Sequence, residues 1–288
     1  MEFWFLLAVL PIFFWGIAAV LAKVSTPKLN VVRVAILISV IEGAMYFAGY
    51  ISFRTSVVLS ADSILLGLAS ALIGMVAYLC FYESMIDGQV AVIGTISAAY
   101  PVLTVVGALL FLSENLTAYE ALGLVAVIFG ILGLSYERTP NSQYSIPKRS
   151  LIFALIAFLL WGVWGLTTKI ALSMLGPGNV FGFYSISAVG IPLVYFTLRR
   201  NRLSTGEKPS RFIWAAGAAG VASNVLGTLI FGFALSLGQA ALVVPISSAY
   251  PLVTVVLAIL LLGEKLNRLQ TVALTLVLLG LITIGITS

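Results

Sequence analysis

The residues best suited to bind a small molecule lie in two apolar segments that each contain a Tyr-Pro dipeptide. In the first segment, Ser97, Tyr100 and Thr104 are spaced by three and four residues, so a helix places their hydroxyl groups on one face. The second segment repeats this spacing in Ser247, Tyr250 and Thr254. Hydroxyl groups donate and accept hydrogen bonds without a fixed charge, so they suit a neutral or zwitterionic ligand.

Pro101 and Pro251 complete the two dipeptides. Proline has no N–H, so it kinks a helix and leaves the carbonyl four residues earlier without its helical donor. Inside a membrane such a carbonyl must be satisfied by protein, water or ligand. Two kinked helices with matched hydroxyl faces predict a polar cavity near the middle of the membrane. The alternative is a packing kink whose hydroxyl groups bond to their own backbone.

Four other side chains are candidates for the same cavity. Asn224 lies in a stripe of small and polar residues spaced by four, where amides can bond between helices or to a ligand. Tyr78 and Tyr82 are one helical turn apart and could supply aromatic walls and hydroxyl donors. Trp161 could line the cavity, and a position at the lipid interface is the alternative.

Two carboxylates could exchange protons. Glu42 lies in the middle of the apolar stretch SVIEGAMYF, where a charge is costly and usually functional. It could instead stay protonated and bond between helices. Glu83 lies one turn before Asp87, so its carboxylate could simply reach water. Both interpretations remain open for each residue.

Histidine is absent from the 288 residues, and Cys80 is the one cysteine. The composition therefore excludes Ser-His-Asp hydrolysis, histidine–zinc protease sites and cysteine metal clusters. We expect no catalytic site, no metal and no cofactor. The 15 lysines and arginines lie between apolar segments rather than in one basic patch, so we expect no nucleic-acid partner.

The elements that position these side chains must be membrane-spanning helices. Of the residues, 61% are hydrophobic and 9% are charged, whereas a soluble domain has about 25% charged residues. A spanning helix needs about 20 mostly apolar residues. We predict an all-α integral membrane protein with ten spans: 3–22, 32–53, 63–85, 90–112, 118–136, 150–171, 179–198, 212–236, 239–262 and 268–287.

The second half of the chain repeats the first. Residues 88–116 and 238–266 are identical at 16 of 29 positions, and FWGIAAVLAKV (14–24) matches LWGVWGLTTKI (160–170). Each half thus has a Trp-Gly…Lys segment, a Tyr-Pro segment and a glutamate before its last segment. We interpret these glutamates, Glu114 and Glu264, as structural.

Five spans in each half have a physical consequence. An odd number makes the second half enter the membrane from the opposite side, which is the inverted-repeat plan of many secondary transporters. We predict two inverted five-helix repeats, 1–138 and 150–288, around a central cavity, with a cytoplasmic linker at 139–149. A duplicated bundle without a transport role is the alternative.

The charges predict the orientation. Thirteen of the 15 lysines and arginines lie in or beside alternate loops, and only Arg54 and Lys169 fall on the other side. The positive-inside rule places the basic loops in the cytoplasm. We therefore expect a multi-pass protein of the cell membrane with both termini outside.

In its duplicated motifs and their order, the chain resembles the drug/metabolite transporter superfamily, specifically its EamA-type ten-helix exporters. The resemblance implies a basket of ten helices with a central cavity, and export of amino acids or related metabolites. Glu83 departs from the small residue common in relatives. The first segment lacks the embedded glutamate of the four-helix multidrug members, so their proton-exchange mechanism is not carried over.

We therefore expect a monomeric secondary transporter that exports small neutral or zwitterionic metabolites, foremost apolar or aromatic amino acids. Its partners would be the substrate, the lipid bilayer and, if Glu42 titrates during transport, protons. No lysine or arginine lies near the middle of a segment, which disfavours phosphorylated substrates. A channel or a lipid-handling membrane protein is the alternative.

Overall fold

The computed structural model describes residues 2–87, 96–135, 147–199, 208–262 and 267–287, and every regular element within them is helical. The first half comprises α1 (Phe3–Leu29), α2 (Val31–Leu37), the π-helix η1 (Ile38–Glu42), α3 (Gly43–Phe53), α4 (Ala61–Asp87), α6 (Tyr100–Phe111) and α7 (Ala118–Ser135). The second half comprises α8 (Lys148–Leu175), α9 (Pro177–Arg199), α10 (Arg211–Leu237), α11 (Ala240–Ser247), α12 (Pro251–Leu262) and α13 (Arg268–Thr287).

These helices confirm the predicted membrane architecture. Nine stretches of the described residues are long and apolar enough to span a membrane. The remaining predicted span is represented by a shorter apolar helix, Ile96–Phe111, because its predicted start at 90–95 lies outside the described residues. Most of the predicted linker, 139–146, lies outside them too, and α8 begins at Lys148.

Two spans differ in detail from the sequence prediction. Helix α1 continues beyond residue 22 to Leu29 and ends at Asn30, whose positive φ of 64° suits asparagine better than most residues. Asn30 Oδ1 then accepts the backbone N–H of Arg33 at 3.1 Å and begins α2. The second span contains η1, a widened turn that ends at Glu42.

The Tyr-Pro segments are interrupted rather than merely kinked. In the second half, α11 ends at Ser247, a turn follows, and α12 begins at Pro251. In the first half, a turn at Ala99 precedes α6, which begins at Tyr100. Proline explains the breaks, because it removes a helical donor and its ring crowds the preceding turn.

The main packing contacts join the two halves. Helix α1 packs along α10, and its repeat counterpart α8 packs along α4. The pairs α3 with α9, α7 with α13 and α6 with α11 each join equivalent spans. Each helix of one repeat thus packs mainly against a helix of the other repeat, as a pseudo-twofold axis between inverted repeats requires. The two repeats therefore form a single helix bundle.

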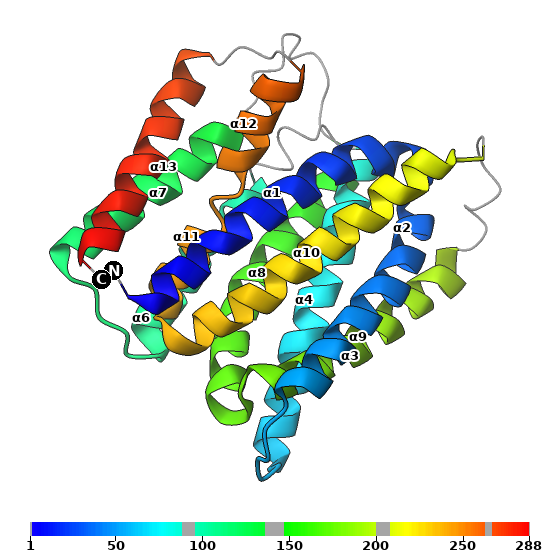
Figure 1. Ribbon diagram of the computed structural model, residues 1–288, viewed down its shortest axis with the longest axis horizontal. Coiled ribbons are helices and arrows are strands. Elements are labelled where there is room, and N and C mark those ends of the chain that lie inside the picture. Colours follow the sequence, from blue (N-terminus) through cyan, green and yellow to red (C-terminus); the bar gives the residue numbers. More distant parts are fainter. Residues whose placement is uncertain (1, 88–95, 136–146, 200–207, 263–266, 288) are drawn as a thin grey trace.

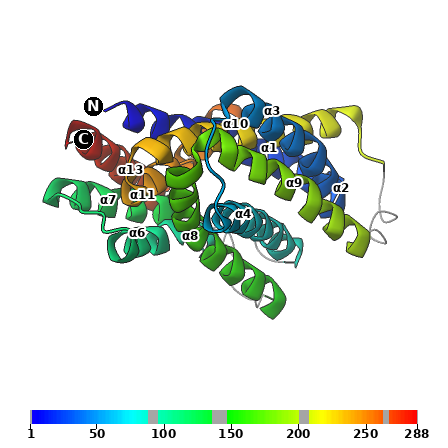
Figure 2. The ribbon, with the colours of Figure 1, turned by 90° about the horizontal axis from the view of Figure 1, so that it is seen from below.

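The helices form two layers around the centre of the molecule. Figure 1 shows α1 and α10 side by side, and in Figure 2 they lie above α4 and α8. Helices α7 and α13 pack together at one side, and α3 and α9 lie at the other. The two termini lie close together at one end in both views.

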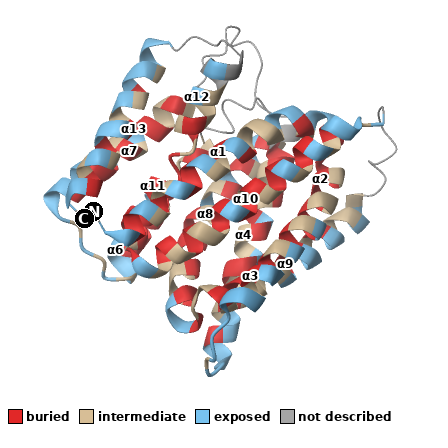
Figure 3. Ribbon diagram, in the orientation of Figure 1, coloured by how far each residue is buried: buried red, intermediate tan, exposed pale blue. Residues whose placement is uncertain are grey.

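The outside of the bundle is apolar. Figure 3 shows exposed residues on the outer faces of the helices and buried residues where helices face one another. Phe111 is 78% exposed and Phe129 is 63% exposed. Such a surface is unsuited to water but matches lipid, in which helices satisfy their own backbone groups.

Candidate functional site

A cavity of about 200 Å³ lies between the α1–α10 layer and the α4–α8 layer, bounded also by η1, α3 and α9. One buried water needs only about 10–15 Å³, so the space suits a small molecule. Its lining follows α1 from Trp15 to Thr26 and α10 from Gly217 to Thr228. The cavity therefore extends toward the end of the bundle where α1 ends and α10 begins.

The opposite end of the bundle is filled by packed side chains. Trp4 on α1, Phe231 on α10 and Leu242 on α11 are all buried. The cavity is thus built asymmetrically along the direction in which the helices span the membrane.

Aromatic side chains form most of the cavity wall. The aromatic lining residues are Trp15, Tyr46, Tyr78, Phe81, Tyr82, Tyr100, Trp161, Trp164, Tyr184 and Tyr250. Several rings support one another in edge-to-face contacts: Tyr78 with Tyr82 at 4.9 Å between centroids, and Tyr46 with Tyr184 at 5.5 Å. The wall therefore offers ring faces and phenolic hydroxyl groups to an occupant.

Glu42 is the one formally charged side chain that lines the cavity within the described residues. It is 2% exposed and lies at the end of η1. Ser185 on α9 donates to the carbonyl of Gly43 at 2.8 Å and so satisfies backbone next to the widened turn. Single π-turns of this kind occur frequently at functional sites, and here the turn presents the carboxylate to the cavity.

Asn224 connects this carboxylate to α1. Its Nδ2 lies 3.4 Å from Glu42 Oε1. Its backbone carbonyl accepts a hydrogen bond from Trp15 Nε1 at 3.2 Å and another from the Thr228 hydroxyl at 3.0 Å. The cavity wall on α10 is therefore held by bonds to α1, its packing partner from the other repeat.

The two Tyr-Pro segments both reach the cavity through their tyrosines. Tyr100 and Tyr250 line it, and the Tyr100 hydroxyl bonds to Ser248 Oγ in the turn before α12. The Tyr100 ring also packs against Trp161, with 5.8 Å between centroids. The structure thus brings Tyr78, Tyr82, Tyr100, Tyr250, Asn224, Trp161 and Glu42 together at one cavity.

The serines and threonines of the predicted hydroxyl faces lie elsewhere. The Thr104 hydroxyl donates to the carbonyl of Gly162 at 3.0 Å, and Ser247 donates to the carbonyl of Ala8 at 2.8 Å. Thr254 bonds to the carbonyl of Tyr250 within its own helix. Ser97 Oγ is buried without a hydrogen-bond partner in the described part of the chain. None of these four side chains lines the cavity as the described residues define it.

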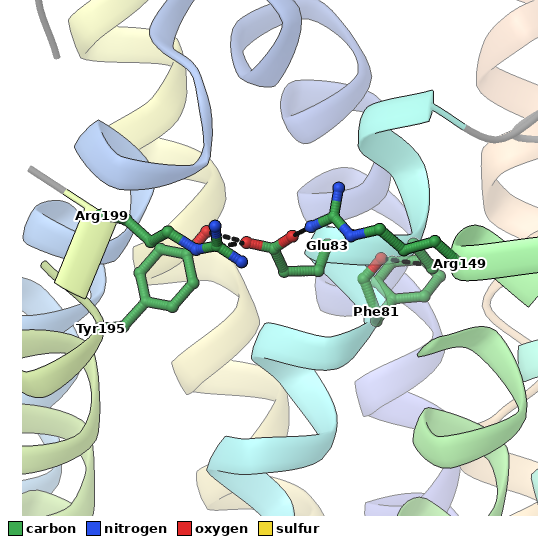
Figure 4. Close-up of polar contacts among 6 residues, drawn as sticks. Phe81, Glu83, Arg149, Tyr195 and Arg199 are labelled. Atoms are coloured by element: carbon green, nitrogen blue, oxygen red, sulfur yellow. Dashed lines mark hydrogen bonds and ion pairs between the residues drawn. The ribbon is translucent and has the colours of Figure 1, made fainter. Parts of the chain in front are cut away.

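Glu83 lies outside the cavity in an ion-pair cluster that joins three helices (Figure 4). Its carboxylate pairs with Arg149 at the start of α8 and lies 3.5 Å from Arg199 Nε at the end of α9. Tyr195 donates to Glu83 Oε1 at 2.6 Å. The glutamate is 4% exposed, whereas both arginine side chains are more than a third exposed. This arrangement ties α4, α8 and α9 together at one end of the bundle.

A second charged cluster holds the turn between α10 and α11 at the other end. Both carboxylate oxygens of Glu114 accept backbone N–H groups at the start of α11, those of Ala240 and Ala241, at 2.8 Å each. Lys169 Nζ donates to the carbonyls of Leu235 and Gly238, at the end of α10. Each charge complements the helix terminus that it meets. Glu264, the counterpart of Glu114 in the second repeat, lies outside the described residues.

Sequence reasoning did not select Tyr46, Tyr184, Trp15 or Trp164 for the cavity. Tyr184 accepts the indole N–H of Trp164 at 2.8 Å and bonds to Thr168 at 2.8 Å, which fixes two aromatic groups of the wall. All four lie in apolar stretches that contain other aromatic residues, and none belongs to a Tyr-Pro dipeptide. The repeated Trp-Gly segments, 14–24 and 160–170, contain Trp15 and Trp164 and could have pointed to both.

Comparisons with known proteins agree with the duplicated fold. The model of the EamA-like transporter family matches residues 2–136 and again residues 148–286. An uncharacterized protein of Methanocaldococcus jannaschii is 30% identical over 141 residues, which cover 48% of this chain and 98% of that protein. One crystal structure superposes with a TM-score of 0.78 over 99% of this chain and 96% of its own, at 16% identity, and so supports the fold.

Proposed function

This chain belongs to the EamA-like transporter family, and we propose that it is a secondary transporter that exports small neutral or zwitterionic metabolites, foremost apolar or aromatic amino acids. Members of this family are multi-pass membrane transporters of the drug/metabolite type. The substrate class and the mechanism are the proposal.

The observation that carries the proposal is the cavity itself. It lies between the repeats, its wall combines aromatic rings with hydroxyl and amide groups, and it extends toward one end of the bundle only. Aromatic faces suit an apolar or aromatic side chain. The hydroxyl groups of Tyr78 and Tyr250, which donate to no acceptor in the described residues, can donate to a substrate carboxylate.

Alternating access follows naturally from this architecture in our proposal. A cavity that extends to one end while packed side chains fill the other suits one of two states of a rocking carrier, and inverted repeats supply the symmetry for the second state. The cavity extends toward the end that carries Lys28 and Arg211, so the positive-inside rule makes this state face the cytoplasm. We accordingly place the protein in the cell membrane with both termini outside, acting as a monomer.

Counterflow tests this function. Purified protein is reconstituted into liposomes preloaded with an unlabelled compound, and uptake of the same labelled compound is followed for a panel of amino acids, sugars and nucleosides. We expect saturable counterflow with phenylalanine, leucine or related amino acids. Flux without counterflow would indicate a channel, and counterflow confined to sugars or nucleosides would contradict the proposed substrate class.

A further inference from the structure

Among the described residues, the only formal charge on the cavity wall is negative. Glu42 supplies its one formal charge within the described residues, and no lysine or arginine among them lines it. A buried carboxylate loses its hydration and needs a hydrogen-bonding or charged partner in exchange. A ligand that supplies a hydrogen-bonding or charged partner to Glu42 is therefore favoured.

The protein supplies only part of the required partner. The contact from Asn224 Nδ2 to Glu42 Oε1 is 3.4 Å, which is beyond the usual range of an N–H···O hydrogen bond. The other oxygen, Oε2, has no hydrogen-bond partner in the described part of the chain. A carboxylate at a cavity wall with unused acceptor capacity is suited to a donor that arrives with the ligand.

The surroundings of Glu42 favour a cationic donor. The titratable side chains that interact with it electrostatically are Tyr46 on α3 and Tyr78 and Tyr82 on α4. Trp15 on α1 lines the same cavity and donates to the Asn224 carbonyl. Aromatic faces attract an ammonium group that lies within about 6 Å of the ring centroid. A carboxylate among such rings attracts an ammonium group and repels an anion.

We propose that Glu42 is the counter-ion of the substrate's ammonium group, and that the cavity takes amphipathic amines with an apolar or aromatic body. Amino acids are one subset of this class. A substrate carboxylate adds less to binding than the ammonium group, because the donors of the described lining are all uncharged. The inference rests on the proposed function, since it takes the cavity as the substrate site.

Four ligands with one phenylethyl-type body test the proposal: phenethylamine, phenylalanine, 3-phenylpropionate and 2-phenylethanol. Binding to the purified, detergent-solubilised protein is measured by equilibrium dialysis for the wild type, Glu42→Gln and Asp62→Asn, an exposed carboxylate that serves as control. We expect the wild type to bind phenethylamine about 10- to 100-fold more tightly than phenylethanol, as a charge-assisted bond predicts. E42Q should abolish this preference, and D62N should retain it.

Two results overturn the proposal. One is equal wild-type affinity for phenethylamine, phenylethanol and phenylpropionate, which needs no variant and decides the question even if E42Q does not fold. The other is an unchanged preference for the amine in folded E42Q, as judged by gel filtration. Counterflow separates this inference from the proposed function. Amine binding that depends on Glu42, without counterflow of any compound, would support the ammonium site and contradict the transporter function. Amino-acid counterflow that is unchanged in E42Q would support the transporter function and contradict the ammonium site.

Discussion

The hydroxyl oxygens of Tyr100 and Ser248 lie 2.5 Å apart, and this bond joins the two interrupted spans of the opposite repeats. Ser248 donates its single hydroxyl hydrogen to the carbonyl of Val244, at 2.6 Å. Tyr100 is therefore the donor and Ser248 Oγ the acceptor. The phenol ring at the cavity wall is thus oriented by a residue of the other half.

Tyr100→Phe and Ser248→Ala should be coupled in a double-mutant cycle. Each substitution removes the same bond, so the double variant should lose less stability than the sum of the single variants, by about 0.5–1.5 kcal/mol. The free energy of unfolding in mixed micelles measures this coupling. Tyr250→Phe is the matched control, because its hydroxyl makes no bond to Ser248; additive effects of Y100F and S248A would contradict the assigned bond.

Removing the Glu114 carboxylate should destabilise the start of α11. Glu114→Ala leaves the N–H groups of Ala240 and Ala241 without their acceptors in a buried site, and charge-assisted bonds of this kind contribute about 1.5–3 kcal/mol. Glu114→Gln retains one acceptor oxygen and should lose about half as much. Thermal unfolding ranks the variants, with D62N as the surface control. Equal unfolding temperatures for E114A and D62N would refute this role.

The Glu83 cluster should respond unequally to loss of its two kinds of charge. The arginines can reach water when Glu83→Gln removes their partner, so we expect a modest loss of about 1–2 kcal/mol. The pair of substitutions R149A and R199A leaves a buried carboxylate with Tyr195 as its remaining described partner, at a cost of about 3–5 kcal/mol.

Adding E83Q to that double-arginine variant provides the decisive comparison. The triple variant should unfold at a higher temperature than the double variant, because it no longer buries an unpaired charge. A triple variant less stable than the double variant would show that the buried carboxylate of Glu83 is not what destabilises the double variant.

Gly178 and Gly190 form a matched pair on α9. A Cβ atom at Gly178 would lie 2.0 Å from the carbonyl oxygen of Phe53, which is backbone and cannot move aside. One at Gly190 would meet no atom of the described residues within 4 Å. Gly178→Ala should therefore cost about 1–3 kcal/mol or more, and Gly190→Ala should be neutral or slightly stabilising through helix propensity. Expression level and thermal unfolding of the two variants provide the measurement. The close approach is refuted if they behave alike.

The membrane architecture could be predicted because it depends on local composition and on a repeated sequence pattern. Apolar stretches of spanning length mark the helices, and the shared Trp-Gly and Tyr-Pro motifs reveal the duplication. The widened turn η1 and the breaks before α6 and α12 could not be placed in this way. They depend on how backbone groups are satisfied by neighbouring helices, as Ser185 does for Gly43.

The sequence predicted the cavity-lining residues correctly only where a residue's role does not depend on a partner far away in the sequence. Tyr100 and Tyr250 reach the cavity, but helical spacing alone placed Thr104 on the face of Tyr100, whereas Thr104 instead bonds to Gly162 of α8. The role of Glu83 depends on two arginines that are 66 and 116 residues away in the sequence. Partners at such distances are set by tertiary packing, which no local pattern encodes.

The packing of each repeat mainly against the other also affects the order in which contacts form during biosynthesis. Helix α1 enters the membrane long before α10, the helix along which it packs, has been made. Glu42 likewise waits for Asn224, which follows it by 182 residues. The spans of the first repeat therefore lack their main packing partners until the second repeat has been made. A ribosome that stalls before α10 would release a chain in which α1 and Glu42 lack their contacts with α10.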